Sequence, residues 1–212
     1  MKLLLLLSGL LFLSGSFCSN DNKTIKDVEK NDVVIVFMDV WEEFPWNYEN
    51  AELLALQENI SVEEAKDRIE VWLDWWENEV AVNIQEKIIP LLEFARSNDI
   101  EIVFSRNYER LSHDLKNLSY REPIINLTDD LDAYLKGKGI DTIIYAGYAL
   151  NNCILGNPTG VRAMAGLKYN VIVIRDATLT GAYQFVSEEE AIAEIEQVGS
   201  FTTVSEVMAE LK

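Results

Sequence analysis

The sequence contains few of the residues that build metal centres and disulfide-bonded scaffolds. Its 212 residues include one histidine, His113, and two cysteines, Cys18 and Cys153. This composition excludes a disulfide framework, a zinc site made of cysteines and histidines, and any mechanism that needs two histidines.

Basic residues are also scarce. Eighteen Lys and Arg stand against 36 Asp and Glu, which gives a formal net charge of -18. A surface this acidic repels phosphate backbones and anionic lipid head groups, so we expect neither nucleic acid nor an anionic membrane surface as a partner. Apolar residues make up 49% of the chain, an ordinary globular balance, and the length suits one domain.

The first apolar run is short. It extends from Leu3 to Leu13 after a basic start, and the small residues Ser14, Gly15 and Ser16 follow it. A transmembrane helix needs about 20 apolar residues, whereas this pattern is typical of a secretory signal peptide. We therefore expect a leader at 1–18, a polar tether at 19–30 and a folded domain at 31–212, in a protein that is exported to the periplasm or the medium.

Cys18 allows an alternative in which the leader is a lipoprotein leader and Cys18 carries a lipid anchor. Phe17 argues against it, because lipoprotein processing prefers a small residue before the cysteine. In either case Cys153 is the one cysteine left in the body of the domain. Such a cysteine is either a buried apolar residue or a reactive thiol.

Four short apolar runs, rich in β-branched residues, are separated by segments with helical periodicity. The runs span 33–38, 100–104, 142–146 and 171–174, and a short strand near Phe201 and a closing helix complete the pattern. Such runs are typical of strands buried on both faces of a parallel sheet. The alternation predicts a three-layer α/β/α sandwich with a mainly parallel sheet.

An additional segment at about 45–82 separates the first strand from the helix expected to follow it. Ser61 to Glu64 form a capping box, and the helix that this box begins carries Trp72, Trp75 and Trp76. We favour the interpretation that these tryptophans pack the added helix onto the body of the domain. The alternative is a lid or a subunit interface.

Reactive side chains follow three of the predicted strands. Asp39 ends the first strand, a loop with Lys116 and Arg121 follows the second, and Cys153 follows the third. Because ligands bind at the carboxyl ends of parallel strands, we expect these groups at one edge of the sheet. A helix that begins near Cys153 and resumes near Pro158 would stabilise a thiolate.

Two segments carry a resemblance to a known family. The sequence GYALNNC at 147–153 resembles the nucleophile segment of the isochorismatase-like cysteine hydrolases, in the nicotinamidase/isochorismatase superfamily. The sequence DVWEEF at 39–44 is similar to the aspartate motif after that family's first strand. The resemblance covers about 31–212, with the added segment as an insertion, and implies the Rossmann-like isochorismatase-type fold.

The resemblance implies an aspartate, a lysine and a cysteine acting together. Asp39 would be the base, Cys153 the nucleophile, and a cis peptide would join Tyr148 to Ala149. The N–H groups of Ala149 and Cys153 would face the oxyanion of the reaction.

The family lysine is not evident in this sequence. At its expected place stands Arg121, which could stabilise a thiolate but cannot transfer protons as lysine does. Lys116 is the second candidate.

Nicotinamidase-type members bind a metal with aspartate and histidines after the second strand. Here that stretch reads SRNYE at 105–109, so we expect neither a metal nor another cofactor.

The resemblance therefore implies an exported, metal-independent cysteine hydrolase. It would cleave an amide C–N bond in a small-molecule substrate through a covalent intermediate at Cys153, as a possible homo-oligomer. The alternative is a non-catalytic binding or interaction protein that kept the fold after Arg121 replaced the lysine.

Overall fold

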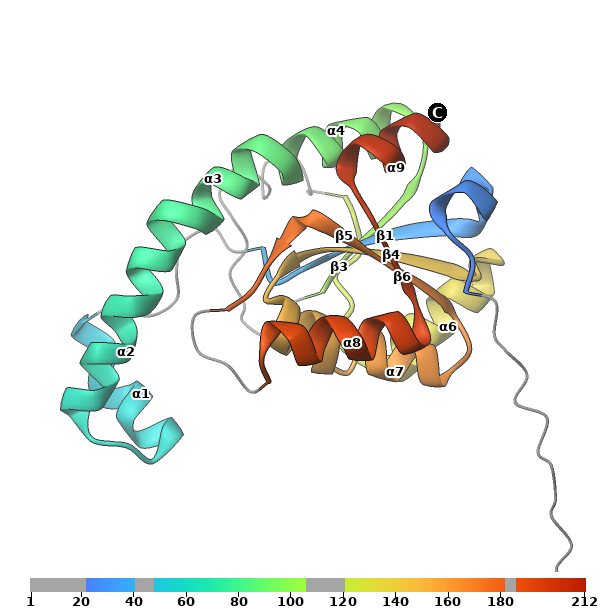
Figure 1. The fold of residues 1–212 in the computed structure, drawn as a ribbon. Helices are drawn as coiled ribbons and strands as arrows, with labels where there is room; N and C mark the ends of the chain where they lie inside the picture. The colour runs from blue at the N-terminus through green and yellow to red at the C-terminus, as the bar shows by residue number, and fades with distance from the viewer. Residues whose placement is uncertain (1–21, 41–47, 106–120, 182–185) are drawn as a thin grey trace, which may run out of the picture.

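The computed structural model describes residues 22–40, 48–105, 121–181 and 186–212 (Figure 1). Five parallel strands form one sheet in the order β3-β1-β4-β5-β6. Their bounds are Val33–Met38 for β1, Glu101–Ser105 for β3, Thr142–Tyr148 for β4, Asn170–Leu179 for β5 and Ser200–Thr202 for β6. The strands predicted from the apolar runs are confirmed.

Helices cover both faces of this sheet. They are α1 Ala51–Glu58, α2 Val62–Trp75, α3 Ala81–Asn83, α4 Ile89–Ser97, α6 Thr128–Lys138, α7 Val161–Gly166, α8 Glu188–Val198 and α9 Val204–Glu210. Three π-helical segments, Trp76–Val80, Ile84–Ile88 and Leu150–Ile154, and three short 3-10 turns, Ile25–Asp27, Lys30–Asp32 and Tyr48–Asn50, complete the described structure.

The core has two halves, one on each face of the sheet. Strand β1 is buried along its whole length, and its residues alternate between the halves: Ile35 and Phe37 pack toward α4 and α9, and Val34 and Val36 toward α6, α7 and α8. The two helical layers lie on opposite sides of the strands in Figure 1. The predicted three-layer α/β/α sandwich is therefore confirmed.

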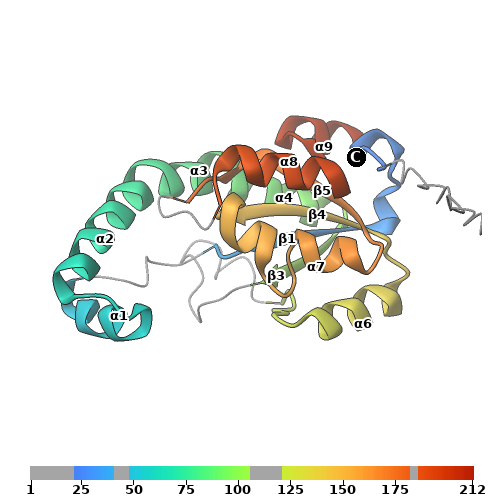
Figure 2. The ribbon, with the colours of Figure 1, turned by 60° about the horizontal axis from the view of Figure 1, so that its bottom comes forward.

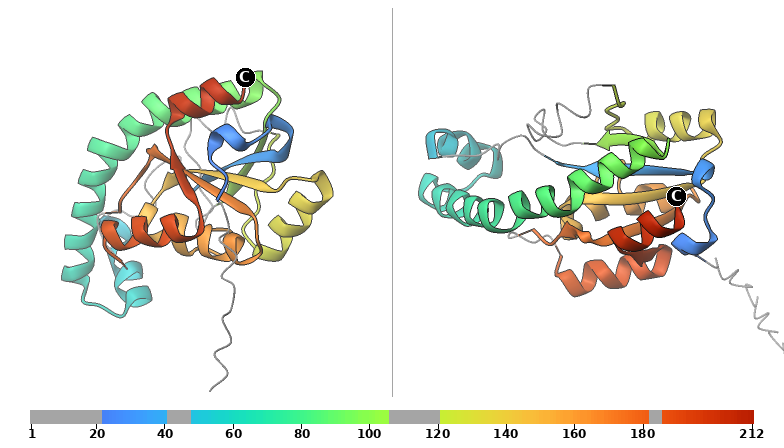
Figure 3. Two further views of the ribbon diagram at one scale, coloured as in Figure 1. Left: turned by 45° about the vertical axis from the view of Figure 1, so that its right-hand side comes forward. Right: turned by 90° about the horizontal axis from the view of Figure 1, so that it is seen from above.

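The added segment forms a helical arm that extends beyond the carboxyl ends of the strands (Figures 2 and 3). Its tip, made of α1 and most of α2, has a small core of its own around Leu54, Ile69 and Trp72. Trp75 and Trp76 instead pack into the core of the domain. The interpretation that the tryptophans pack the added helix onto the body therefore holds for these two.

One long helical stretch leads from the arm back to the domain. It begins at Ser61, whose hydroxyl accepts the Glu64 N–H at 3.1 Å, as the capping box predicts. Helical residues then continue from Val62 to Ser97 through two π-helical segments. Pro90 is the second residue of α4, directly after the second π-helical segment. The wide π turn accommodates a proline ring that would otherwise meet the carbonyl of the preceding turn.

The predicted leader and Cys18 lie outside the described residues. Within the described ranges, no helix is long and apolar enough to cross a membrane.

Strands β1 and β4 approach each other unusually closely at their carboxyl ends. Gly147 pairs with Met38 and has a φ of +115°, a conformation that L side chains rarely adopt. A Cβ placed on Gly147 would lie 2.0 Å from the Met38 carbonyl oxygen. Only glycine fits at this position.

Replacing Gly147 with alanine should therefore destabilise the fold severely. We expect the free energy of unfolding to fall by about 3 kcal/mol or more, because backbone strain adds to overpacking. Denaturant unfolding measures the change. Gly137→Ala is the matched control, because nothing lies within 4 Å of its Cβ position and its helix α6 favours alanine. Equal stability of the two variants would contradict the close approach.

Candidate active site

The edge of the sheet that carries the candidate residues is also its topological switch point. The chain leaves β1 toward β3 and leaves β4 toward β5, so the connections after these two adjacent strands run in opposite directions. Such a point is where open α/β sheets bind ligands. Asp39 follows β1 and Cys153 follows β4, so the structure places the two at neighbouring strand ends.

Asp39 is fixed by its backbone and is completely buried. Its φ of +47° is uncommon for a residue other than glycine, and aspartate tolerates it better than most. The Asp39 N–H donates to the Ser105 carbonyl at the end of β3 at 2.8 Å. The ends of two strands, β1 and β3, thus fix the backbone of Asp39.

The peptide bond between Tyr148 and Ala149 is cis, at the position that the resemblance implies. The Ala149 carbonyl then accepts the N–H groups of Asn152 at 3.2 Å and Ile154 at 3.1 Å. These bonds turn the chain into the π-helical segment that carries Cys153, whose exposure is only 6%. Its thiol is free of any disulfide.

The helix expected to begin near Cys153 takes a different form. Cys153 is the fourth residue of a five-residue π turn, and α7 begins only at Val161 rather than near Pro158. A turn this short sums few peptide dipoles, so it offers little of the macrodipole that was expected to stabilise a thiolate. Any activation of Cys153 must come from neighbouring side chains and backbone N–H groups.

The connection after Cys153 packs tightly back onto the turn. A Cβ on Gly160 would lie 2.7 Å from the Ile154 carbonyl oxygen and 2.9 Å from that of Cys153. Thr159 is buried; its carbonyl accepts the Tyr145 hydroxyl at 2.6 Å, and its own hydroxyl pairs with that of Ser105. The cysteine turn is therefore held against both β3 and β4.

Asn151, which was not among the predicted site residues, fixes the other side of the turn. Its buried side chain donates to the Val186 carbonyl at 3.1 Å and accepts the Gly181 N–H at 2.9 Å. One amide, two residues before Cys153, thus connects the nucleophile turn to both flanks of the segment after β5. The only signal in the sequence was an amide next to the candidate nucleophile.

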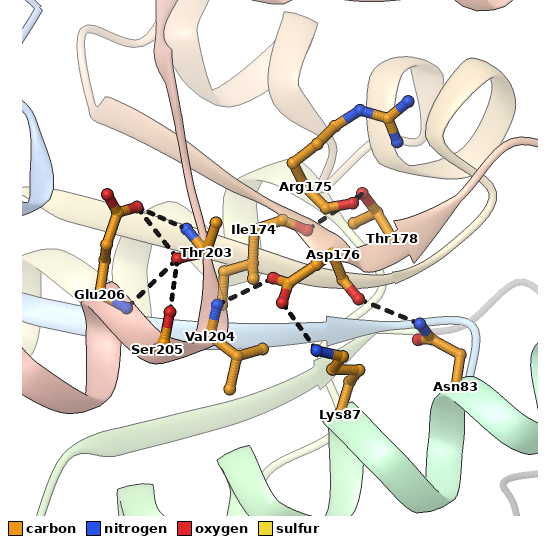
Figure 4. Close-up of polar contacts among 10 residues, drawn as sticks. All are labelled: Asn83, Lys87, Ile174, Arg175, Asp176, Thr178, Thr203, Val204, Ser205 and Glu206. Atoms are coloured by element: carbon orange, nitrogen blue, oxygen red, sulfur yellow. Dashed lines mark hydrogen bonds and ion pairs between the residues drawn. The ribbon is translucent and has the colours of Figure 1, made fainter.

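Tyr148 is anchored by the long helix. It is completely buried, which raises the pKa of its hydroxyl and keeps it protonated, and it donates to Asn83 Oδ1 at 2.8 Å. Asn83 in turn donates to the Asp176 carbonyl at 3.0 Å, and Lys87 pairs with the Asp176 carboxylate at 3.0 Å (Figure 4). The second Asp176 oxygen accepts the Val204 N–H at 2.8 Å. This network joins the helix to the cis peptide and to β5.

Arg121 is exposed, whereas Asp39 and Cys153 are buried. Among the described residues, Arg121 forms no ion pair with Asp39. The adjacent Glu122 binds Arg96 instead, with the shortest N–O distance at 2.5 Å. The second candidate, Lys116, lies outside the described residues, as does His113.

The profile of the isochorismatase domain matches residues 67–207, two thirds of the chain. The chain belongs to the isochorismatase family. This match begins after Asp39, so the family assignment rests on the part of the domain that contains Cys153. No curated protein matches the chain.

Solved structures with the isochorismatase-type fold resemble this one at low sequence identity. YcaC from Pseudomonas aeruginosa, with hexane-2,5-diol and covalent acrylamide, has a TM-score of 0.58 at 20% identity and covers 89% of this chain and 84% of its own. A cysteine hydrolase from Pseudomonas syringae pv. phaseolicola has a TM-score of 0.54 at 17% identity, and the match covers 86% of this chain and 93% of that protein. YcaC from Escherichia coli, described as an octameric hydrolase of unknown specificity, has a TM-score of 0.54 at 16% identity. The match covers 87% of this chain and 81% of that protein.

Two arginines near the isochorismatase-family site are engaged elsewhere. Arg162 forms two hydrogen bonds of 2.8 Å with the Glu194 carboxylate, and Arg175 pairs with Glu188. Both guanidinium groups are therefore paired with carboxylates of α8.

The part of the chain that the structure describes has no group of three or more His, Cys, Asp or Glu side chains that could hold a metal ion.

Replacing Asn151 with leucine should loosen the cysteine turn. The change leaves the Gly181 N–H and the Val186 carbonyl without their buried partner, and we expect the free energy of unfolding to fall by about 2–4 kcal/mol. Asn152→Leu, one residue along the same turn, is the control and should change it by less than about 1 kcal/mol. Chemical denaturation of both variants tests this, and equal losses would contradict the role given to Asn151.

Proposed function

We propose that this isochorismatase-family protein is a metal-independent cysteine hydrolase that cleaves an amide C–N bond in a small molecule. The observation that carries the proposal is the placement of two buried residues, Asp39 and Cys153, at the adjacent carboxyl ends of β1 and β4, with a cis peptide beside them. An acid and a thiol buried together at a ligand-binding edge are the parts of an activated nucleophile.

The reaction begins with transfer of the Cys153 proton to the Asp39 carboxylate. The sulfur attacks the amide carbon, and the resulting oxyanion accepts hydrogen bonds from the N–H groups of Ala149 and Cys153. The C–N bond then breaks, and the leaving amine takes the proton from Asp39, which leaves a thioester on Cys153. Asp39 next removes a proton from water, and the hydroxide attacks the thioester carbon. The C–S bond then breaks, the Cys153 sulfur takes the proton back from Asp39, and a carboxylic acid is released.

The surroundings of the pair support this chemistry. Val40, Tyr148 and Leu150 are buried next to the reacting residues, so little water competes with the substrate. Among the relatives by fold, one is named a cysteine hydrolase and another holds covalent acrylamide, a small amide. These names belong to those proteins and are consistent with an amide at a cysteine here.

The second candidate function is a non-catalytic binding protein. It is favoured by one observation: the residue at the place of the family lysine is Arg121, which is exposed and cannot transfer protons.

Export and assembly are proposed on other grounds. The apolar run up to Leu13 is the basis for export, with Cys18 as an alternative lipid anchor. The octameric state named for the Escherichia coli relative motivates a homo-oligomer of this chain.

Hydrolysis of a panel of small amides, followed by ammonia release, tests the function. We expect turnover that Cys153→Ala lowers by at least about a thousandfold and Asp39→Asn by about a hundredfold or more, because one variant removes the nucleophile and the other the base. Circular dichroism of each variant controls for folding. Release of ammonia that persists in Cys153→Ala would overturn the proposal, and no release from any amide would favour the binding protein.

Arg121 is tested by a pair of substitutions in the same assay. If Arg121 supplies the positive charge of the site, Arg121→Gln should lower kcat/KM about three- to tenfold, a small effect because the side chain is exposed. Arg121→Lys keeps the charge and should retain the activity. Equal rates for the Gln variant and the unaltered protein would remove Arg121 from the mechanism.

A further inference from the structure

Trp75 carries a buried polar group whose function the fold does not explain. Its side chain is 7% exposed, and among the described residues its indole Nε1–H donates no hydrogen bond. A buried donor without a partner costs about 1–3 kcal/mol, and buried indole N–H groups usually find one. Phenylalanine would fill most of the same space without that cost.

The position of Trp75 connects it to the proposed active site. Its ring meets the Tyr148 ring edge to face, with centroids 6.2 Å apart. Tyr148 begins the cis peptide, and Trp75 belongs to the same buried cluster as Ala149, the second residue of that peptide, and Val40, the residue after Asp39. The indole therefore contacts the first residue of the cis peptide and shares its half of the core with the residue that follows Asp39.

The helix presents Trp75 to this site because it is not a regular α-helix. Trp75 and Asn83 both contact Tyr148, although they are eight residues apart. In an α-helix this spacing would turn them about 80° apart around the axis. The π-helical segment Trp76–Val80 lies between them and widens the turn, which brings both onto the face toward β4. Such segments occur frequently at functional sites.

A second buried polar atom lies near the same peptide. The Thr180 hydroxyl oxygen is buried and makes no hydrogen bond among the described residues. Thr180 directly follows Leu179, which pairs with Tyr148 across β4 and β5. Polar groups with spare hydrogen-bonding capacity thus occur on two elements next to Tyr148, one on α2 and one after β5.

We propose that Trp75 determines specificity at the cysteine hydrolase site by donating its Nε1–H to an acceptor oxygen of the bound amide. The proposal rests on the proposed function for the identity of the site. The substrate class is a small amide whose apolar part packs against the Trp75 and Tyr148 rings. Amides that offer an acceptor to the indole should bind better than those that do not, because the donor is otherwise left unpaired.

Two reagents that modify Cys153 test the contact in the full chain. Acrylamide attaches a three-carbon amide to the sulfur, and propyl methanethiosulfonate attaches an apolar three-carbon chain without an acceptor. Mass spectrometry confirms each adduct. In the spectrum of ¹⁵N-labelled indole groups, assigned with Trp75→Phe, the Trp75 signal should move downfield with acrylamide and more than the other four tryptophan signals, but not with the propyl group.

Reaction rates give the matched measurement on variants. Trp75→Phe should slow the modification of Cys153 by acrylamide about three- to tenfold, which is the effect expected from the loss of one hydrogen bond. The rate of modification by propyl methanethiosulfonate should not change. Trp72→Phe, in the separate core of the arm, should change neither.

Two results would overturn the proposal. One is a Trp75 indole signal that moves equally with both adducts, because this would indicate displacement of water. The other is a failure of Cys153 to react with acrylamide. A moved Trp75 signal without hydrolysis of any amide would support the contact and refute the proposed function.

Discussion

The candidate site depends on the close approach of two parallel strands at their carboxyl ends. Gly147 of β4 passes so near the Met38 carbonyl that a side chain cannot fit, and its positive φ redirects the chain. On β1 the next residue, Asp39, also has a positive φ, so both strands turn at the same level. The cis peptide and the turn that carries Cys153 follow within six residues of Gly147. Without this contact the acid and the thiol would have no fixed relation to each other.

The helical insertion supports the same edge of the sheet. Beyond its tip it is anchored at three levels: Trp75 contacts Tyr148, Asn83 binds both Tyr148 and the Asp176 carbonyl, and Lys87 pairs with the Asp176 carboxylate. A segment that looks like an addition to the family fold thus helps to position the first residue of the cis peptide. Its exposed tip leaves open faces on α1 and α2, including Leu56, but the part near the sheet belongs to the site.

The strands and the edge where Asp39 and Cys153 lie could be predicted because apolar runs and strand ends are local signals. The place of the cis peptide came from the resemblance of the 147–153 segment. What the sequence did not reveal depends on contacts between distant residues: Asn151 binds residues 30 and 35 positions away, and Tyr148 binds Asn83 across 65. In place of the helix expected at Cys153 there is a π turn, whose first carbonyl, that of Ala149, accepts the N–H groups of Asn152 and Ile154.

The central claim is that Asp39 takes the proton of Cys153, and the alkylation rate of Cys153 by iodoacetamide at neutral pH tests it most directly. If Asp39 is the base, Asp39→Asn should slow the reaction at least about tenfold, because the thiolate can no longer form by proton transfer. If Asp39 is only a neighbouring negative charge, its removal should favour the thiolate and leave the rate equal or higher. A slower Asp39→Asn variant supports the account, and an unchanged or faster one contradicts it.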